Sequence, residues 1–188
     1  MTNEFKSIYD QAEAGMKKVI DATKKDFSTL RTGRANTSIL DRVTVEYYGS
    51  EVPINQVANI SVPEARMILI QPWDKSILPQ LEKAIQKADL GLNPSNDGSV
   101  IRLVIPQLTE ERRKELVKIA KKEAEEKRVA VRNLRRDAND QLKKLEKDGI
   151  VSEDEYKKGL DEIQKLTDKY IEQIDRLLEN KEAEILEV

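Results

Sequence analysis

Apolar residues recur at steps of three and four near both ends of the chain, which is the spacing of one face of an α-helix. The first series runs from Phe5 to Leu30. It predicts a helix that stops near Thr32-Gly33, because glycine readily adopts the left-handed conformation that ends many helices. A second series, from Val117 to Leu145, alternates strictly between the two steps and is typical of a coiled-coil seam. It predicts a helix over residues 109–148, about 60 Å long at a rise of about 1.5 Å per residue.

A third helical series follows Asp148-Gly149, where a turn between helices is expected. Ser152 and Glu155 have the spacing of a capping box, in which each side chain accepts a hydrogen bond from the other residue's backbone N–H. Apolar residues then continue from Tyr156 to Ile185 in a stripe wide enough for two neighbours. The three series together predict a long antiparallel three-helix bundle.

The pattern changes between Gly33 and Pro106. Val43, Val45 and Tyr47 alternate with polar residues, which indicates a strand, and Gly49-Ser50 is the expected turn toward the next strand. Two further apolar runs, at residues 67–70 and 100–105, read as buried strands. Leucine, isoleucine and alanine at positions 78, 81, 85 and 88 predict a helix ended by the glycine at position 91. This segment is expected to form a small, β-rich α/β domain.

Because this segment interrupts the helical series, the predicted fold class is α+β with two domains, L-shaped, in which the small domain is inserted into the bundle. The bundle domain comprises residues 1–30 plus 106–188, and the inserted domain comprises residues 31–105. The chain crosses between them twice, near 30–34 and 105–107, and two short crossings are expected to act as hinges. The predicted hinge residues are Leu30, Arg31, Thr32, Gly33, Ile105, Pro106 and Gln107.

The composition argues against catalysis. The chain has no cysteine and no histidine, so it lacks the residues that most often serve as thiol nucleophile, general base or transition-metal ligand. Its seven glycines are scattered and form no phosphate-binding loop. Its acidic clusters are explained by solvated helix surfaces. We therefore expect a protein that is not an enzyme, binds no cofactor or metal of its own, and is cytoplasmic, since no apolar stretch suits a membrane span or a signal peptide.

Charge is segregated along the chain. Residues 109–149 carry a net charge of +4 and residues 150–188 carry −6. From Arg112 to Arg136 there are eleven lysines and arginines against four glutamates. Arginine binds phosphate by paired hydrogen bonds, so this stripe is a candidate for binding a nucleic-acid backbone. The alternative is that the arginines pair with the acidic third helix; clustering of the cations slightly favours RNA. The candidate RNA-binding residues are Arg113, Lys122, Arg128, Arg132, Arg135 and Arg136, with Arg31 and Arg34 extending the patch.

Across nearly its full length the chain resembles the bacterial ribosome recycling factor family. Six short segments carry the resemblance: LRTGRA at 30–35, VEYYG at 45–49, VPINQ at 52–56, LTEERR at 108–113, VRN at 131–133 and RDAN at 136–139.

The resemblance implies a monomer with roughly the shape of transfer RNA. Such a protein binds the post-termination 70S ribosome, with its helical domain on large-subunit ribosomal RNA near positions such as Arg128 and Arg132. With elongation factor G, which hydrolyses the GTP, it splits the ribosome into subunits and so releases messenger RNA and deacylated transfer RNA. The inserted domain is expected to face the elongation factor and to move about the crossings.

Two other classes of function compete with this interpretation. A helical chaperone or adaptor would use its apolar seam to recruit partner helices. A nucleotide-driven enzyme is the weaker alternative, because the sequence has no loop to hold a phosphate.

Overall fold

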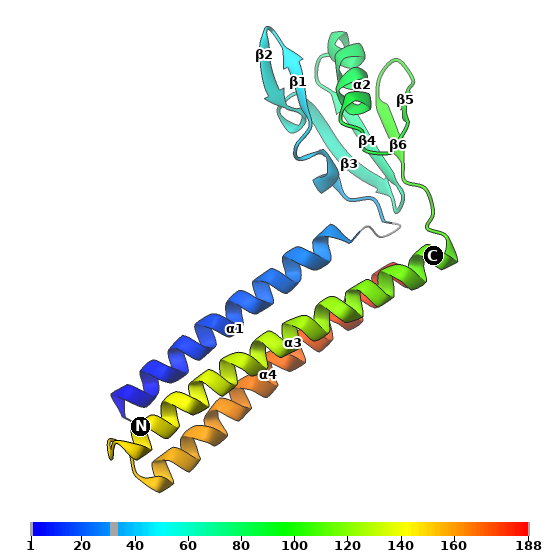
Figure 1. Ribbon diagram of the computed structural model, residues 1–188. Helices are drawn as coiled ribbons and strands as arrows, with labels where there is room; N and C mark the ends of the chain where they lie inside the picture. The colour runs from blue at the N-terminus through cyan, green and yellow to red at the C-terminus, as the bar shows by residue number, and fades with distance from the viewer. Residues whose placement is uncertain (1, 31–33, 188) are drawn as a thin grey trace. The chain divides into compact units, whose positions relative to one another are not determined.

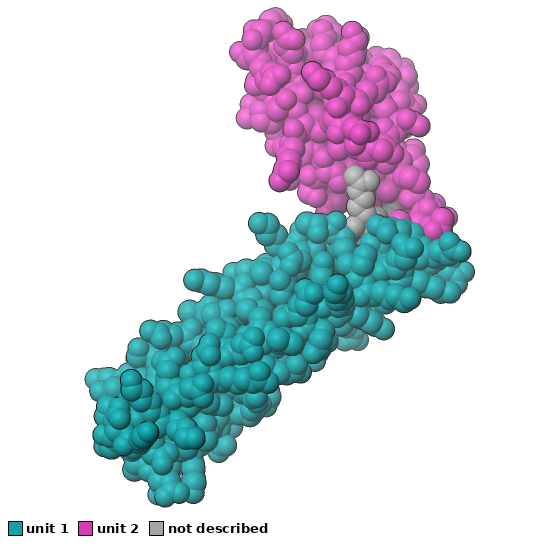
Figure 2. Space-filling view, in the orientation of Figure 1, with its two compact units in different colours: residues 1–30, 110–186 teal, residues 31–109, 187–188 magenta. Residues whose placement is uncertain are grey.

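The chain divides into two compact units. The computed structural model describes residues 2–30 and 34–187. One unit comprises Met1–Leu30 and Glu110–Leu186, and the other comprises Arg31–Thr109 with Glu187–Val188 (Figure 2). Each is built from its own kind of element, helices in the first and mainly strands in the second. The predicted α+β fold class, a helical bundle with an inserted β-rich segment, is confirmed.

Three long helices form the first unit: α1 (Asn3–Thr29), α3 (Glu110–Lys147) and α4 (Glu153–Leu186). They pack along one another, with α3 antiparallel to α1 and α4 (Figure 1). The first helix begins at Thr2, whose Oγ1 accepts a hydrogen bond from the N–H of Phe5 at 3.2 Å. It ends earlier than predicted, because Leu30 is already extended. The predicted stop at Thr32-Gly33 lies outside the described residues.

The turn between α3 and α4 follows the sequence signals closely. Gly149 adopts a φ of +74°, the left-handed conformation that ends α3. The capping box is confirmed: the N–H of Ser152 donates to Glu155 Oε2 at 3.0 Å, and the N–H of Glu155 donates to Ser152 Oγ at 3.1 Å. These bonds satisfy two N–H groups that the first turn of a helix leaves without a backbone partner.

The buried face of α3 departs from the predicted coiled-coil seam at both ends. Leu116 is buried where Val117 was expected, and Leu142 is buried where Gln141 was expected. In the middle of the helix the predicted positions are buried, at Ala120, Ala124, Val131 and Ala138. The expected strict coiled-coil seam is therefore correct in the middle of α3 and wrong at its two ends.

The described residues of the second unit form six strands and one α-helix. A two-stranded antiparallel sheet pairs β1 with β2, and a four-stranded antiparallel sheet has the order β3-β4-β6-β5. The bounds are β1 (Thr44–Tyr47), β2 (Ser50–Pro53), β3 (Ala58–Glu64), β4 (Met67–Pro72), α2 (Leu78–Lys87), β5 (Pro94–Asn96) and β6 (Ile101–Val104). Three short 3-10 helices, Thr37–Leu40, Ile54–Gln56 and Lys75–Ile77, connect them.

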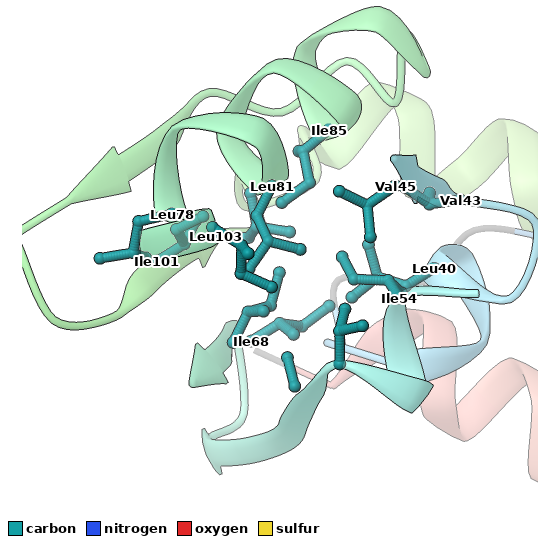
Figure 3. Packing of buried hydrophobic residues seen from close by; sticks show 14 residues of the cluster. Leu40, Val43, Val45, Ile54, Ile68, Leu78, Leu81, Ile85, Ile101 and Leu103 are labelled. Atoms are coloured by element: carbon teal, nitrogen blue, oxygen red, sulfur yellow. The ribbon is translucent and has the colours of Figure 1, made fainter. Parts of the chain in front are cut away.

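One apolar core holds this unit together. Side chains from α2, from the middle strands β4 and β6, and from the β1 region point toward one another (Figure 3). Ile68, Ile70, Ile101 and Leu103 alternate along β4 and β6 and are buried, because successive side chains of a strand face opposite sides of the sheet. Leu81 and Ile85 of α2 cover that side.

Two strands and one turn differ from the sequence prediction. The edge strands β3 and β5 were not predicted, since each contains a proline and β5 is polar and largely exposed. The turn between β1 and β2 has Tyr48 and Gly49 at its centre, with φ of +50° and +79°, instead of Gly49-Ser50.

The crossing that enters α3 is irregular from Ile105 to Thr109. Ile105 is tied to the strand unit, because its N–H donates to the Arg66 carbonyl at 2.8 Å. Pro106 and Gln107 are exposed. Of the other predicted hinge residues, Leu30 forms the extended end of α1, and Arg31, Thr32 and Gly33 lie outside the described residues.

Candidate nucleic-acid interface

A line of cations follows one exposed face of α3. Residues that are four positions apart, or a whole number of helical turns of 3.6 residues apart, lie on the same side of a helix. We call this set the α3 stripe. It consists of Lys114, Lys118, Lys122, Arg132, Arg136 and Lys143, which extend over about 44 Å at about 1.5 Å per residue. Lys122, Arg132 and Arg136 were candidates from the sequence, whereas Lys114, Lys118 and Lys143 were not singled out, although their helical spacing is visible there.

The guanidinium groups in the middle of the α3 stripe are available at the surface. Arg132 has 39% of its side chain exposed, and its guanidinium pairs with Glu125 of the same helix at 3.3 Å. Arg136 is exposed and donates a long bond to Asn133 at 3.4 Å. Such exposed ion pairs contribute little to stability, so these groups can exchange partners at small cost. Lys122 is exposed and forms no ion pair within the described part of the chain.

Arg128 has a different environment, although it lies only one turn from Arg132. Its guanidinium pairs with Asp175 of α4 at 2.7 Å and with Glu125 at 3.0 Å, and only 19% of its side chain is exposed. Burial alone would lower the pKa of Arg128, but the hydrogen bonds to these two carboxylates outweigh it and raise the pKa. In the folded bundle Arg128 therefore joins α3 to the acidic helix α4.

Arg135 also turns toward α4. It donates to Gln164 Oε1 at 2.9 Å, and its Nε is buried without a hydrogen-bond partner. Arg113 is half-buried near the start of α3. Both sequence hypotheses are thus represented: Arg128 and Arg135 contact the third helix, and Arg132, Arg136 and Lys122 face outward. Which of them bind RNA stays a prediction.

The remaining candidates lie near the first crossing. Arg34 pairs with Glu187 at 2.9 Å, and both residues belong to the strand-rich unit. Arg31 lies outside the described residues. Within residues 2–30 and 34–187, no cluster of three acidic, histidine or cysteine side chains is arranged to hold a metal ion. No helix in that part of the chain is long and apolar enough to cross a membrane.

A three-helix bundle that presents a line of cations about 44 Å long, together with a separate small β-rich unit, is an architecture suited to binding an extended anionic partner. The chain belongs to the ribosome recycling factor family, whose family profile, "Ribosome recycling factor", matches residues 23–186.

Curated relatives agree with this assignment. The ribosome-recycling factor of Heliobacterium modesticaldum is 62% identical over 188 residues, covering 100% of both chains. That of Syntrophomonas wolfei is 61% identical, covering 98% of this chain and 100% of the relative.

Solved structures show the same fold. A solution structure of a ribosome recycling factor has a TM-score of 0.76 at 49% identity and covers 100% of both chains. A second similar structure also covers 100% of both chains, with a TM-score of 0.63 and 49% identity; it describes the T. thermophilus ribosome recycling factor, together with E. coli elongation factor G, bound to the E. coli post-termination complex.

Proposed function

We propose that this protein recycles ribosomes after termination. It binds the post-termination 70S ribosome as a monomer in the cytoplasm and acts with elongation factor G, which binds and hydrolyses the GTP. The two subunits then separate, and messenger RNA and deacylated transfer RNA leave. Membership of the family supports this proposal, and so does the complex with elongation factor G described for the similar T. thermophilus factor.

The observation that carries the proposal is the α3 stripe. In α3, cations that face α4 pair with its side chains, as Arg128 does with Asp175, while Arg132, Arg136 and Lys122 are left at the surface. A line of cations about 44 Å long, interrupted by Glu125 between Lys122 and Arg132, suits a phosphate backbone, which carries no sequence information. Large-subunit ribosomal RNA is the partner that we assign to this face.

The protein's own part is mechanical. A bundle of three long helices is stiff, so a force applied at one end is transmitted along it. Between the strand-rich unit and α3 the chain is irregular from Pro106 to Thr109, which includes one of the two crossings expected to act as hinges. We propose that elongation factor G acts on the strand-rich unit, which moves about these crossings while α3 stays on RNA.

The salt dependence of ribosome binding tests the RNA interface. Removing one cation that neutralises a phosphate reduces the slope of log affinity against log salt by about 0.7–0.9. Arg132→Gln combined with Arg136→Gln should therefore lower the slope by about 1–2 and weaken binding most at low salt. Arg176→Gln is a matched control, because Arg176 is exposed on α4 and pairs with Glu172 at 2.8 Å. An unchanged slope in the double variant would argue against an RNA-binding α3 stripe.

A subunit-splitting assay tests the activity itself. Light scattering of post-termination ribosomes should fall only when this protein, elongation factor G and GTP are all present. The double variant should split more slowly at equal concentration and recover when its concentration is raised, since its defect is in binding. Splitting that proceeds equally well without this protein would refute the proposed function.

A further inference from the structure

The α3 stripe is interrupted by a carboxylate at its centre. Lys118, Glu125 and Arg132 follow one another at steps of seven residues, which is close to two helical turns, so Glu125 lies in line with the cations. It occupies the widest interval of the stripe, from Lys122 to Arg132, which is about 15 Å along the helix. A carboxylate repels phosphate, so its place within a face assigned to RNA requires an explanation.

Glu125 pairs with two arginines at once. Its Oε2 accepts a hydrogen bond from Nη1 of Arg128 at 3.0 Å, and its Oε1 accepts one from Nη1 of Arg132 at 3.3 Å. The hydrogen bond from Arg128 lowers the pKa of Glu125; loss of solvation offsets part of this effect, and Arg132 adds to it. The carboxylate is therefore ionised at neutral pH and neutralises positive charge where the two guanidinium groups converge.

The two arginines depend on Glu125 to different degrees. Arg128 is also fixed by α4, because its Nε and Nη2 both lie 2.7 Å from Asp175 Oδ1. Arg132 has no second carboxylate partner within residues 2–30 and 34–187, and its side chain is 39% exposed. Loss of the Glu125 charge would therefore release Arg132 and leave Arg128 bound to α4.

We propose that Glu125 is an internal counter-ion of the α3 stripe, which holds the Arg132 guanidinium until a phosphate displaces it. Carboxylate and phosphate oxygens accept the same hydrogen bonds from arginine, so the two compete for one position. An exposed pair of this kind is weak, so RNA can replace it. Glu125 nevertheless lowers the affinity for any RNA that uses Arg132, which limits binding of RNA that makes few other contacts. This inference rests on the proposed function for the assignment of RNA to α3.

The alternative is that Glu125 is structural and only positions the two arginines. The two roles predict effects of opposite sign. Removing a counter-ion strengthens RNA binding and steepens its salt dependence, because one more cation becomes available to neutralise a phosphate. Removing a positioning group weakens binding or leaves it unchanged, since the arginines are then less well placed. Glu125→Gln keeps the size of the side chain and one acceptor oxygen, so it tests the charge with little change in shape.

Binding of a fluorescein-labelled oligouridylate to the full-length protein measures the sign. At low salt, Glu125→Gln should bind about two- to fivefold more tightly than the wild type, the range of one exposed ion pair. Its slope of log affinity against log salt should be steeper by about 0.7, the contribution of one phosphate of a single strand. Glu172→Gln is the matched control and should change little, because it removes the same charge on α4, where Glu172 pairs with Arg176 at 2.8 Å.

A double-variant cycle shows whether Glu125 acts through Arg132. In a protein that carries Arg132→Gln, adding Glu125→Gln should leave oligouridylate affinity and slope nearly unchanged, since the guanidinium to be released is missing. Equal or weaker binding by the Glu125→Gln single variant, or an equal gain in the Arg132→Gln background, would overturn the proposal. The proposed function is judged separately on ribosomes. If Arg132→Gln with Arg136→Gln leaves the salt slope of ribosome binding unchanged, the assignment of α3 to ribosomal RNA fails, while the counter-ion role of Glu125 stands on the oligouridylate result.

Discussion

Gly159 of α4 lies where a side chain would meet both other helices of the bundle, and replacing it by alanine tests that packing. A Cβ atom at this position would lie 2.9 Å from Cε2 of Phe5 on α1 and 3.2 Å from Cδ1 of Leu142 on α3. A Cβ atom essentially never lies within 3.0 Å of a carbon to which it is not bonded, so a neighbour has to move. Both neighbours are buried, and the Phe5 ring is flat and rigid.

Two effects of opposite sign decide the outcome of Gly159→Ala. Alanine is favoured over glycine inside a helix by about 1 kcal/mol. Inserting a methyl group into a packed core costs about 1–3 kcal/mol. Because the clash involves side chains of two other helices, we expect overpacking to win, with a net loss of about 1 kcal/mol in the free energy of unfolding. This corresponds to a fall in Tm of roughly 4–8 °C for a domain of this size.

Urea unfolding followed by circular dichroism at 222 nm measures this change. Gly15→Ala is the matched control, since the three atoms nearest to its Cβ would all belong to Leu134, with the two methyl carbons at 3.0 and 3.1 Å. Leu134 is half-buried and its flexible end can turn aside, so this variant should equal or exceed the wild type in stability. Adding Phe5→Leu to Gly159→Ala should cost less than the sum of the two separate destabilisations. A Gly159→Ala protein more stable than the wild type by the full gain of about 1 kcal/mol expected for alanine in a helix would refute close packing of Phe5 against α4.

Two predictions concern pH. Burial, with the charge of Asp26, raises the pKa of Glu123, whose Oε2 is buried without a hydrogen-bond partner among the described residues. Protonated Glu123 therefore stabilises the fold at pH values below 4.5, the pKa of the carboxyl in the unfolded chain. This stabilisation is lost as the pH rises through the higher pKa of the folded protein. Glu123→Gln should therefore stabilise the bundle at pH 7 by about 1 kcal/mol and add little at pH 4; equal urea midpoints at pH 7 would contradict this. The carboxylate of Asp97 accepts hydrogen bonds from backbone N–H groups of the β5–β6 turn and pairs with Arg102 at 2.6 Å, which lowers the pKa of Asp97 from 3.8 to about 2. Ionised Asp97 therefore stabilises the fold above pH 3.8, and this stabilisation is lost as the pH falls toward 2. Asp97→Asn should flatten the acid-unfolding curve of the strand-rich unit, followed by Trp73 fluorescence, between pH 4 and 2; an unchanged curve would show that the bonds to Asp97 do not stabilise that unit.

The elements that the sequence predicted well are those encoded locally. The helical steps of α1 and α4, the capping box of Ser152 and Glu155, and the apolar strands β4 and β6 depend on residues close together along the chain. Hydrophobic periods and caps act through neighbours at three or four positions, or at two in a strand, so the linear order of residues already contains them. The absence of histidine and cysteine likewise needs no structure.

The edge strands and the ends of the buried face of α3 could be recognised only in the tertiary structure. Nothing in Pro94-Ser95-Asn96 indicates a strand, and β5 exists because β6 offers it hydrogen-bond partners. The strict seven-residue seam misplaced the ends of α3's buried face, because that face is set by two neighbouring helices at once. Leu116 and Leu142 are buried by those neighbours.

The arginines of α3 show most clearly what the sequence determined and what the tertiary structure decided. Arg128 and Arg132 are four residues apart on one helix face, equally charged and equally suited to phosphate in the sequence. Asp175, which lies 47 residues after Arg128 in the chain, pairs with the Arg128 guanidinium within the bundle. The Arg132 guanidinium stays at the surface. The sequence determined that a cationic stripe exists. Only the packing of α4 against α3 decided which charges remain available, because an ion pair depends on distance in space and not along the chain.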